Sequence, residues 1–273
     1  MWDAEQYLRF GGERARPFFD LVAQVGAASP RYVADLGCGP GTLTAALARR
    51  WPDASVVGVD NSPEMIAAAK VSTVPGTTGQ TASGQEAPHL SFTLGDVRDW
   101  RPERPLDVLV CNAVLQWVPG HEELLLRWAD LLAPDGWLAF QLPGNFDQPS
   151  HTLVEEMARS PRWRGLLADA RLNRQAGDPA DYVALLARPG FEVDAWETSY
   201  LHILHGENPV LEWTRGTTLR PVLAALDAGQ AAAFALEYGQ RLREAYKPHP
   251  FGTVFPFRRV FAVVHRTDPG RAR

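Results

Sequence analysis

Two acidic residues and a glycine-rich turn have the spacing of a nucleotide-binding site. The stretch VADLGCGPGTL at residues 33–43 carries one acid, Asp35, and three glycines: Gly37, Gly39 and Gly41. Glycine permits a sharp turn and lets a ligand approach the backbone without a Cβ in the way. A helix expected over 42–51 would direct unsatisfied backbone amides at that ligand. Strand, glycine turn and helix in this order predict the opening of a βαβ unit.

The residue types around this turn distinguish between nucleotide ligands. The dinucleotide pattern G-x-G-x-x-G would need glycine at position 42, which is Thr42. An acid and no phosphate-binding lysine suit a ligand with a cationic methionyl end. A second acid, Asp60, ends the apolar run SVVGVD, where a carboxylate can bind a ribose diol. These features predict S-adenosyl-L-methionine as the cofactor, and an α/β protein with an unrelated glycine turn is the alternative.

Composition restricts the class of protein. The chain has 273 residues, 45% of them hydrophobic, which favours one large domain or a core domain with an insertion. A net charge of −5 without a basic stripe argues against nucleic acid. The N-terminus lacks the apolar region of a signal peptide, and no apolar run reaches the ~18 residues of a membrane span. Cys38 and Cys111 lack metal-ligand spacing and cannot form a disulfide framework.

From these observations we expect a cytoplasmic enzyme with no metal site, no nucleic-acid partner and no membrane contact. The sequence leaves the oligomeric state open and is compatible with a monomer.

Apolar runs separated by helical patterns predict a mostly parallel sheet covered on both faces. Strands are expected at 32–36, 55–59, 90–94, 106–111 and 137–142, and later at 191–202 and 259–266. Residues 144–186 and 205–256 have helical patterns and emerge near the sheet ends, which predicts a cap that selects the substrate. The expected organisation is an N-terminal helical lid over 1–30, a cofactor-binding core over 31–143 completed by the two later strands, and this cap.

The core motifs resemble those of class I S-adenosylmethionine-dependent methyltransferases. They are DLGCGPG at 35–41, Asp60, GDV at 95–97 and PDG at 134–136. The chain is also similar, over nearly its whole length, to the trans-aconitate 2-methyltransferase family. The stretches behind this narrower resemblance are YLRF at 7–10, ERARP at 13–17, NAVLQW at 112–117, QLP at 141–143 with Asn145, PSH at 149–151, LRP at 219–221 and FRRVF at 257–261. The resemblance implies an α/β, Rossmann-like, doubly wound sheet of seven strands, mostly parallel with an antiparallel last strand, and a helical cap.

The resemblance also implies roles for individual residues. Asp35 and the glycine turn are expected to hold the methionyl part of the cofactor, and Asp60 the ribose. Asp96 and Val97 would frame the adenine, with a helix N-cap as the structural alternative for Asp96. The full cofactor set is Asp35, Gly37, Cys38, Gly39, Gly41, Asp60, Asn61, Asp96, Val97 and Asn112. The residues expected to position the acceptor are Asn112, Gln116 and Trp117, although Trp117 could equally be a core residue.

The implied reaction transfers a methyl group to a carboxylate of trans-aconitate or a related small polycarboxylate, giving a monomethyl ester and S-adenosyl-L-homocysteine. A carboxylate with a pKa of about 4 is ionised at neutral pH, so no residue is expected to act as a general base. A polyanion entering an acidic protein needs local cations, and the arginine fork matches carboxylates. The candidates for binding it are Arg9, Arg14, Arg16, Arg220 and Arg259, with Tyr200 and His202 as neutral donors.

Two other functions stay open at the level of sequence. A methyltransferase for an uncharged acceptor, such as a phenol or a lipid, would need a catalytic base and an apolar cap lining. A cofactor-binding regulatory protein without catalysis is the second, but an intact glycine turn and surplus arginines argue against it.

Overall fold

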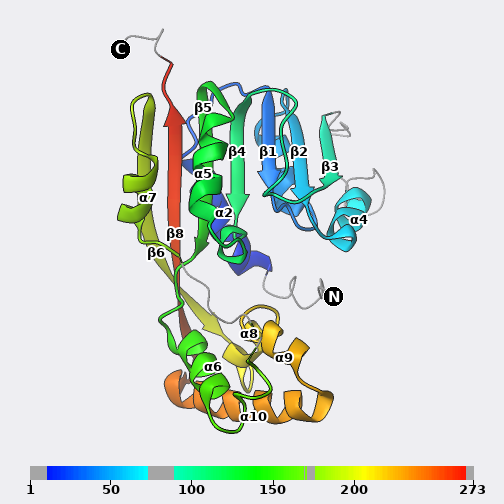
Figure 1. Ribbon diagram of the computed structural model, residues 1–273, viewed down its shortest axis with the longest axis vertical. Helices are drawn as coiled ribbons and strands as arrows, with labels where there is room; N and C mark the ends of the chain where they lie inside the picture. Colours follow the sequence, from blue (N-terminus) through cyan, green and yellow to red (C-terminus); the bar gives the residue numbers. More distant parts are fainter. Residues whose placement is uncertain (1–10, 73–88, 169, 171–175, 269–273) are drawn as a thin grey trace.

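The computed structural model describes residues 11–72, 89–168, 170 and 176–268. Within them a single eight-stranded sheet has the order β3-β2-β1-β4-β5-β8-β6, and the short β7 pairs with β8 alone (Figure 1). The strands are β1 (Tyr32–Leu36), β2 (Ser55–Asp60), β3 (Leu90–Leu94), β4 (Leu106–Asn112), β5 (Leu132–Pro143), β6 (Phe191–Leu204), β7 (Pro248–His249) and β8 (Gly252–Arg266). Leaving the two-residue β7 aside, seven strands form the sheet, as predicted.

The direction of the strands also agrees with the prediction. The first five strands pair in parallel, whereas β8 runs antiparallel to both β5 and β6. Because the carboxyl ends of β1, β2 and β4 meet at one edge, the polar residues that follow them are brought together there. The doubly wound α/β prediction is confirmed.

Helices cover both faces of the sheet, which explains the nearly continuous apolar strands. Figure 1 shows α5 (His121–Asp130) in front of the sheet and α2 (Gly11–Ala23) behind it. Trp128 of α5 is buried on one face, and Phe18 of α2 packs on the other together with Leu47 of α3 (Thr42–Arg50). A further helix, α4 (Pro63–Ser72), lies beside β2 and β3. We call this layered unit the core.

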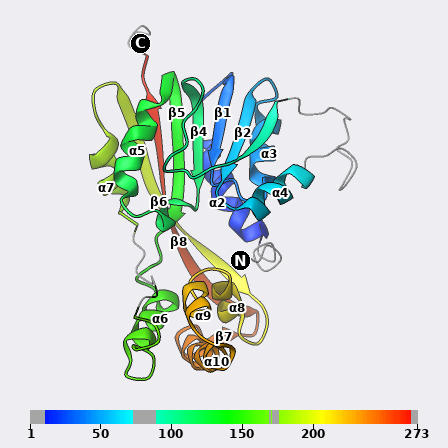
Figure 2. The same cartoon turned by 45° about the vertical axis from the view of Figure 1, so that its right-hand side comes forward.

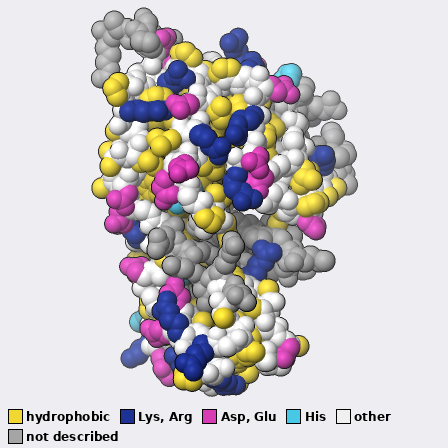
Figure 3. All heavy atoms as spheres, in the orientation of Figure 1, with side chains coloured by type: hydrophobic (Ala, Val, Ile, Leu, Met, Phe, Trp, Pro, Cys, Tyr) yellow, Lys and Arg dark blue, Asp and Glu magenta, His cyan; other side chains and the backbone are white. Residues whose placement is uncertain are grey.

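A second lobe, which we call the cap, surrounds the far ends of β6 and β8 (Figure 2). It contains α6 (Pro149–Arg159), α8 (Pro209–Arg215), α9 (Arg220–Ala225) and α10 (Ala228–Ala245). The cap has its own apolar cluster, in which Trp213 and Phe255 pack near Phe234 and Tyr238. Asp227 and Gln230 form the capping box at the start of α10 that their spacing predicts. Figure 3 shows the broad core above and the smaller cap below.

Parts of the predicted organisation need correction. The strand expected to begin at 137 is β5, which begins at Leu132. The last strand begins at Gly252 rather than at 259. Phe255 and Phe257 are buried in alternation along it, but Pro256 between them argues against a strand when only the sequence is considered. The helix α7 (Pro179–Leu186), expected in the cap, packs on the core through Tyr182, whose ring lies 5.1 Å from that of Phe140. The described part of the expected lid, α2, packs against β5 and β8, and residues 1–10 lie outside the described residues.

None of the helices in the described part of the chain combines the length and apolar character that a membrane span requires. In the same part of the chain, no group of three or more His, Cys, Asp and Glu side chains is arranged to hold a metal ion.

Candidate active site

The three glycines of the turn after β1 have different tasks. All three have positive φ: 78° for Gly37, 54° for Gly39 and 79° for Gly41. A Cβ added to Gly37 would lie 2.1 Å from Val114 Cγ2, and one added to Gly41 would lie 2.6 Å from Phe92 Cζ. A Cβ added to Gly39 would meet no atom of the described residues within 4 Å. The outer glycines therefore permit packing, whereas Gly39 presents its backbone to open space, where a ligand can approach.

Asp60 lies directly beside this turn. Its Oδ2 accepts the backbone N–H of Gly39 at 2.9 Å, and its Oδ1 accepts the N–H of Ser62 at 2.9 Å. Because each carboxylate oxygen has two acceptor positions, the group can hold the turn and still accept hydroxyl groups from a ligand. The neighbouring Asn61 is exposed. The position of Asp60 thus fits the ribose contact, which stays a prediction.

Asp35 is a buried acid, 2% exposed, at the end of β1. Thr44 of α3 donates its hydroxyl to Asp35 Oδ2 at 2.6 Å. Burial raises the pKa of Asp35 to about 6, the charge of Asp60 adds to the rise, and the Thr44 hydrogen bond opposes it. A cationic group bound close by would stabilise the ionised form. The same environment raises the pKa of the Cys38 thiol, so Cys38 is not a reactive thiolate.

Asp96 and Val97 follow β3 at the same edge of the sheet. The Arg98 guanidinium donates to both oxygens of Asp96, at 2.9 and 2.6 Å, and its hydrogen bonds lower the pKa of that carboxyl. Asp96 also accepts the backbone N–H of Arg98 at 2.9 Å, a turn contact rather than a regular helix cap. Val97 is buried against the core. Their role in holding adenine stays a prediction.

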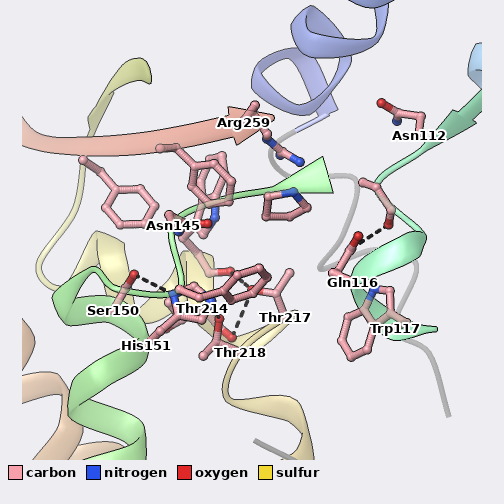
Figure 4. A pocket seen from close by; sticks show the side chains of 16 residues that line it. Asn112, Gln116, Trp117, Asn145, Ser150, His151, Thr214, Thr217, Thr218 and Arg259 are labelled. Atoms are coloured by element: carbon pink, nitrogen blue, oxygen red, sulfur yellow. Dashed lines mark hydrogen bonds between the residues drawn. The ribbon is translucent and has the colours of Figure 1, made fainter. Parts of the chain in front are cut away.

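A cavity opens beyond the carboxyl ends of β4 and β5, between the core and the cap (Figure 4). Asn112, at the end of β4, lines it together with Gln116 and Trp117 of the 3-10 helix η1 (Leu115–Trp117). Gln141 of β5 donates to Asn112 Oδ1 at 2.5 Å, which orients the Asn112 amide. The three residues predicted to position the acceptor are therefore brought together at one wall.

Arg259 of β8 contributes a buried cation to the cavity. Arg259 is only 6% exposed. Its guanidinium carbon lies 4.5 Å from the centre of the Phe257 ring. Its Nη1 donates to Gln141 Oε1 at 3.4 Å. The preceding Arg258 points to the other side of the strand and binds Glu197 at 2.9 Å. The two-residue period of a strand thus sends one arginine inward and the other outward.

The other residues predicted to bind the acceptor do not line this cavity. Tyr200 is buried and donates to Asp20 Oδ2 at 2.7 Å, while Arg16 lies over the Tyr200 ring at 5.1 Å and stays exposed. His202 stacks on Trp213 in the cap at 4.9 Å, and Arg220 begins α9. Arg9 and the side chain of Arg14 lie outside the described residues. Among the described residues, the predicted set of guanidinium groups is therefore represented in this cavity by Arg259 alone. For Arg16, Tyr200, His202 and Arg220, contact with the acceptor stays a prediction.

Hydroxyl and amide groups of the cap occupy the wall opposite Asn112. His151 Nδ1 lies 3.2 Å from Ser150 Oγ, and its Nε2 lies 3.0 Å from Thr218 Oγ1. Asn145, in the link from β5 to α6, is 0% exposed, and neither atom of its amide has a hydrogen-bond partner among the described residues. A buried amide left unpaired costs about 1–3 kcal/mol. Asn145 and His151 stand in stretches that carry the family resemblance, but their spacing did not indicate a cavity.

Comparison with known proteins places this geometry in a family. A family model described as a methyltransferase domain matches residues 9–195. A trans-aconitate 2-methyltransferase of Streptomyces avermitilis is 53% identical over 97% of this chain and 97% of its own length. The protein of the same name from Mycobacterium tuberculosis is 47% identical over 96% of each.

Solved structures support the fold. The YcgJ protein of Bacillus subtilis has a TM-score of 0.56 at 13% identity and covers 92% of this chain and 98% of its own. Haemonchus contortus phosphoethanolamine N-methyltransferase 2 has a TM-score of 0.56 at 15% identity over 95% of this chain and 56% of its own. At such identities the likeness concerns the fold alone, whereas the sequence matches extend over nearly every residue. The chain belongs to the trans-aconitate 2-methyltransferase family.

Proposed function

We propose that this protein is an S-adenosylmethionine-dependent O-methyltransferase that converts one carboxylate of trans-aconitate, or of a closely related small polycarboxylate, to a monomethyl ester. Curated relatives with that name are 47% to 53% identical over almost the whole chain. The observation that carries the acceptor class is the buried Arg259 guanidinium, which faces a cavity beside the cofactor edge of the sheet. A cation at that place suits an anionic acceptor.

The residues at the carboxyl ends of β1 and β2 fit the cofactor. The open side of Gly39 leaves room for the methionyl part, and the Asp35 carboxyl provides negative charge close by. Asp60 is placed to take the ribose hydroxyls. When bound, the cofactor supplies a methyl group on a positively charged sulfur. Asn112 follows Cys111, which pairs with Leu36 directly before the glycine turn, and it lines the cavity. From there it would orient the reacting groups.

The protein contributes to the reaction by positioning the methyl donor and the acceptor. An ionised carboxylate attacks without losing a proton, so the reaction requires no general base. Arg259 would hold a carboxylate that is not methylated, because a guanidinium on the attacking oxygen would reduce its nucleophilicity. Trp213 and Phe257 line the cavity from the cap side and limit water there. Holding donor and acceptor in line can supply about 7–11 kcal/mol of the barrier.

We further propose that the cap selects the acceptor and that the core binds the cofactor. His151 is engaged at both ring nitrogens by hydroxyl groups, which supports a role in holding Ser150 and Thr218 together. The molecule that the cap would bind is a small polycarboxylic acid.

The test uses methyl-labelled cofactor and three groups of acceptors: di- and tricarboxylates, phenols and lipids. We expect label in a base-labile ester of trans-aconitate, identified by mass. Label only on phenols or lipids would contradict the acceptor class. Binding of the cofactor with no transfer to any acceptor would contradict catalysis itself.

A further inference from the structure

Asn145 is the most unusual polar residue of the cavity. Its amide is completely buried, and neither Nδ2 nor Oδ1 has a hydrogen-bond partner among the described residues. Folded proteins pair nearly all buried polar groups, and an exception points to a strained, catalytic or ligand-binding position. Figure 4 shows Asn145 between Arg259 and the Ser150–His151 pair, at the wall formed by the cap.

The backbone around Asn145 is held in place on both sides. Gly144 donates its N–H to Arg258 O at 3.0 Å and accepts a hydrogen bond from Arg258 Nη1 at 3.1 Å. Gln148 donates its N–H to Asn145 O at 3.2 Å, which begins the turn into α6. A Cβ at Gly144 would lie 2.9 Å from Val260 Cγ2, so the segment packs closely on β8. The backbone that carries the Asn145 side chain is therefore fixed at the link between core and cap.

The cap places hydroxyl groups and rings beside Asn145. The Ser150 and Thr218 hydroxyls bind the His151 ring, and Phe146 packs edge-on against the same ring at 5.1 Å. Arg259 supplies positive charge at the side of the core. A polyanion spanning the cavity would thus meet the Arg259 cation at one end and, at the other, the Asn145 amide, which has no hydrogen-bond partner among the described residues.

We propose that Asn145 is a specificity-determining residue whose Nδ2–H donates to a carboxylate oxygen of the acceptor, on a carboxylate that is not methylated. This inference rests on the proposed function and names the residue that recognises one of the acid's remaining carboxylates. The Asn145 amide has no hydrogen-bond partner among the described residues, and binding of that carboxylate would supply one. A site built in this way rejects an acid without the corresponding carboxylate, because the buried amide would then stay unpaired.

The test compares Asn145→Leu, which keeps the branched shape without polar atoms, with Asn145→Asp, which keeps the shape and adds a negative charge. At saturating cofactor, we expect Asn145→Leu to raise KM for trans-aconitate by about tenfold or more, with kcat changed by less than about threefold. Asn145→Asp should raise KM further because two carboxylates repel each other. The melting temperature of Asn145→Leu should not fall, since the change removes an unpaired buried amide. If Asn145 had a purely structural role, Asn145→Leu would lower the melting temperature and leave KM for trans-aconitate unchanged.

A matched control is the same substitution at Asn208, also in the cap, whose Nδ2 donates to Gly239 O at 3.0 Å. Asn208→Leu should lower the melting temperature and leave KM for the acid unchanged. A further measurement uses dicarboxylate analogues, each lacking one carboxylate of trans-aconitate. The ratio of KM between Asn145→Leu and the wild type should fall to about one for the analogue that lacks the carboxylate held by Asn145.

The outcomes separate this inference from the function on which it rests. A wild-type protein that esterifies no acid overturns both. An active wild type together with an unchanged KM in Asn145→Leu overturns the inference alone, as does an equal rise of KM for every analogue. If Asn145→Leu does not fold, a KM for Asn145→Asp equal to that of the wild type overturns it as well.

Discussion

Replacing Arg259 tests the acceptor site most directly. Arg259→Met keeps an unbranched apolar stem that can pack on Phe257 and removes the charge. We expect a selective loss of affinity for the acid, because Asp35 and Asp60, the residues proposed to bind the cofactor, lie in another part of the site, at the ends of β1 and β2.

The size of the effect follows from the contacts of Arg259. A hydrogen bond between charged partners contributes about 1.5–3 kcal/mol, and 1.4 kcal/mol corresponds to a tenfold change, so KM should rise about 10- to 150-fold. The guanidinium over Phe257 adds about 2 kcal/mol of cation–π attraction in the free protein because Arg259 is buried, so Arg259→Met should also lower the melting temperature. Arg259→Lys should fall between wild type and Met, because it keeps the charge and loses the planar fork.

The assay is initial-rate kinetics with varied trans-aconitate, combined with calorimetric titration of S-adenosylhomocysteine and thermal unfolding. Arg266→Met is the control, since Arg266 lies on the same strand about 23 Å away and binds Leu132 O at the far side of the core. It should change stability and leave KM for the acid unaltered. Equal losses of affinity for the acid and for S-adenosylhomocysteine in Arg259→Met would refute the reasoning, because they would make Arg259 a structural residue.

Three further predictions concern the cofactor side. Gly39→Ala should weaken S-adenosylhomocysteine binding about tenfold or more in calorimetry, with a small fall in melting temperature. Gly41→Ala should mainly lower the melting temperature. The larger loss of binding in Gly41→Ala would contradict the assignment of Gly39 to the ligand and Gly41 to packing. Asp60→Ala should weaken cofactor binding while circular dichroism stays native, and an unchanged dissociation constant would count against the ribose contact. The pKa of Asp35 in the folded protein, about 6, lies above the unfolded value of about 3.9, so the folded state binds this proton more tightly and stability falls as pH rises from about 4 to above 6. Urea unfolding across that window should show the fall in the wild type and its absence in Asp35→Asn; identical profiles would show that Asp35 does not titrate there.

Much of the fold was predictable because it depends on local patterns. Apolar runs identified the strands, and the alternation of strands with helices predicted a parallel sheet. Pro256 shows how such reading fails: a proline inside a strand pattern argues against a strand, yet β8 continues through it beside β6. The packing of α7 on the core was likewise hidden, since its helical pattern does not state which lobe its apolar face covers.

The acids and glycines of the cofactor edge follow from the sequence alone, because a left-handed turn requires glycine and parallel strands bring their carboxyl ends together. The acceptor cavity cannot be predicted from the sequence alone. Whether an arginine reaches it depends on the face of β8 on which the side chain lies and on partners far away in sequence, as the contrast between Arg258 on Glu197 and Arg259 on Phe257 shows. The burial of the Asn145 amide, which has no hydrogen-bond partner among the described residues, likewise depends on the packing of core and cap, since burial is a property of the packed chain and not of any single stretch.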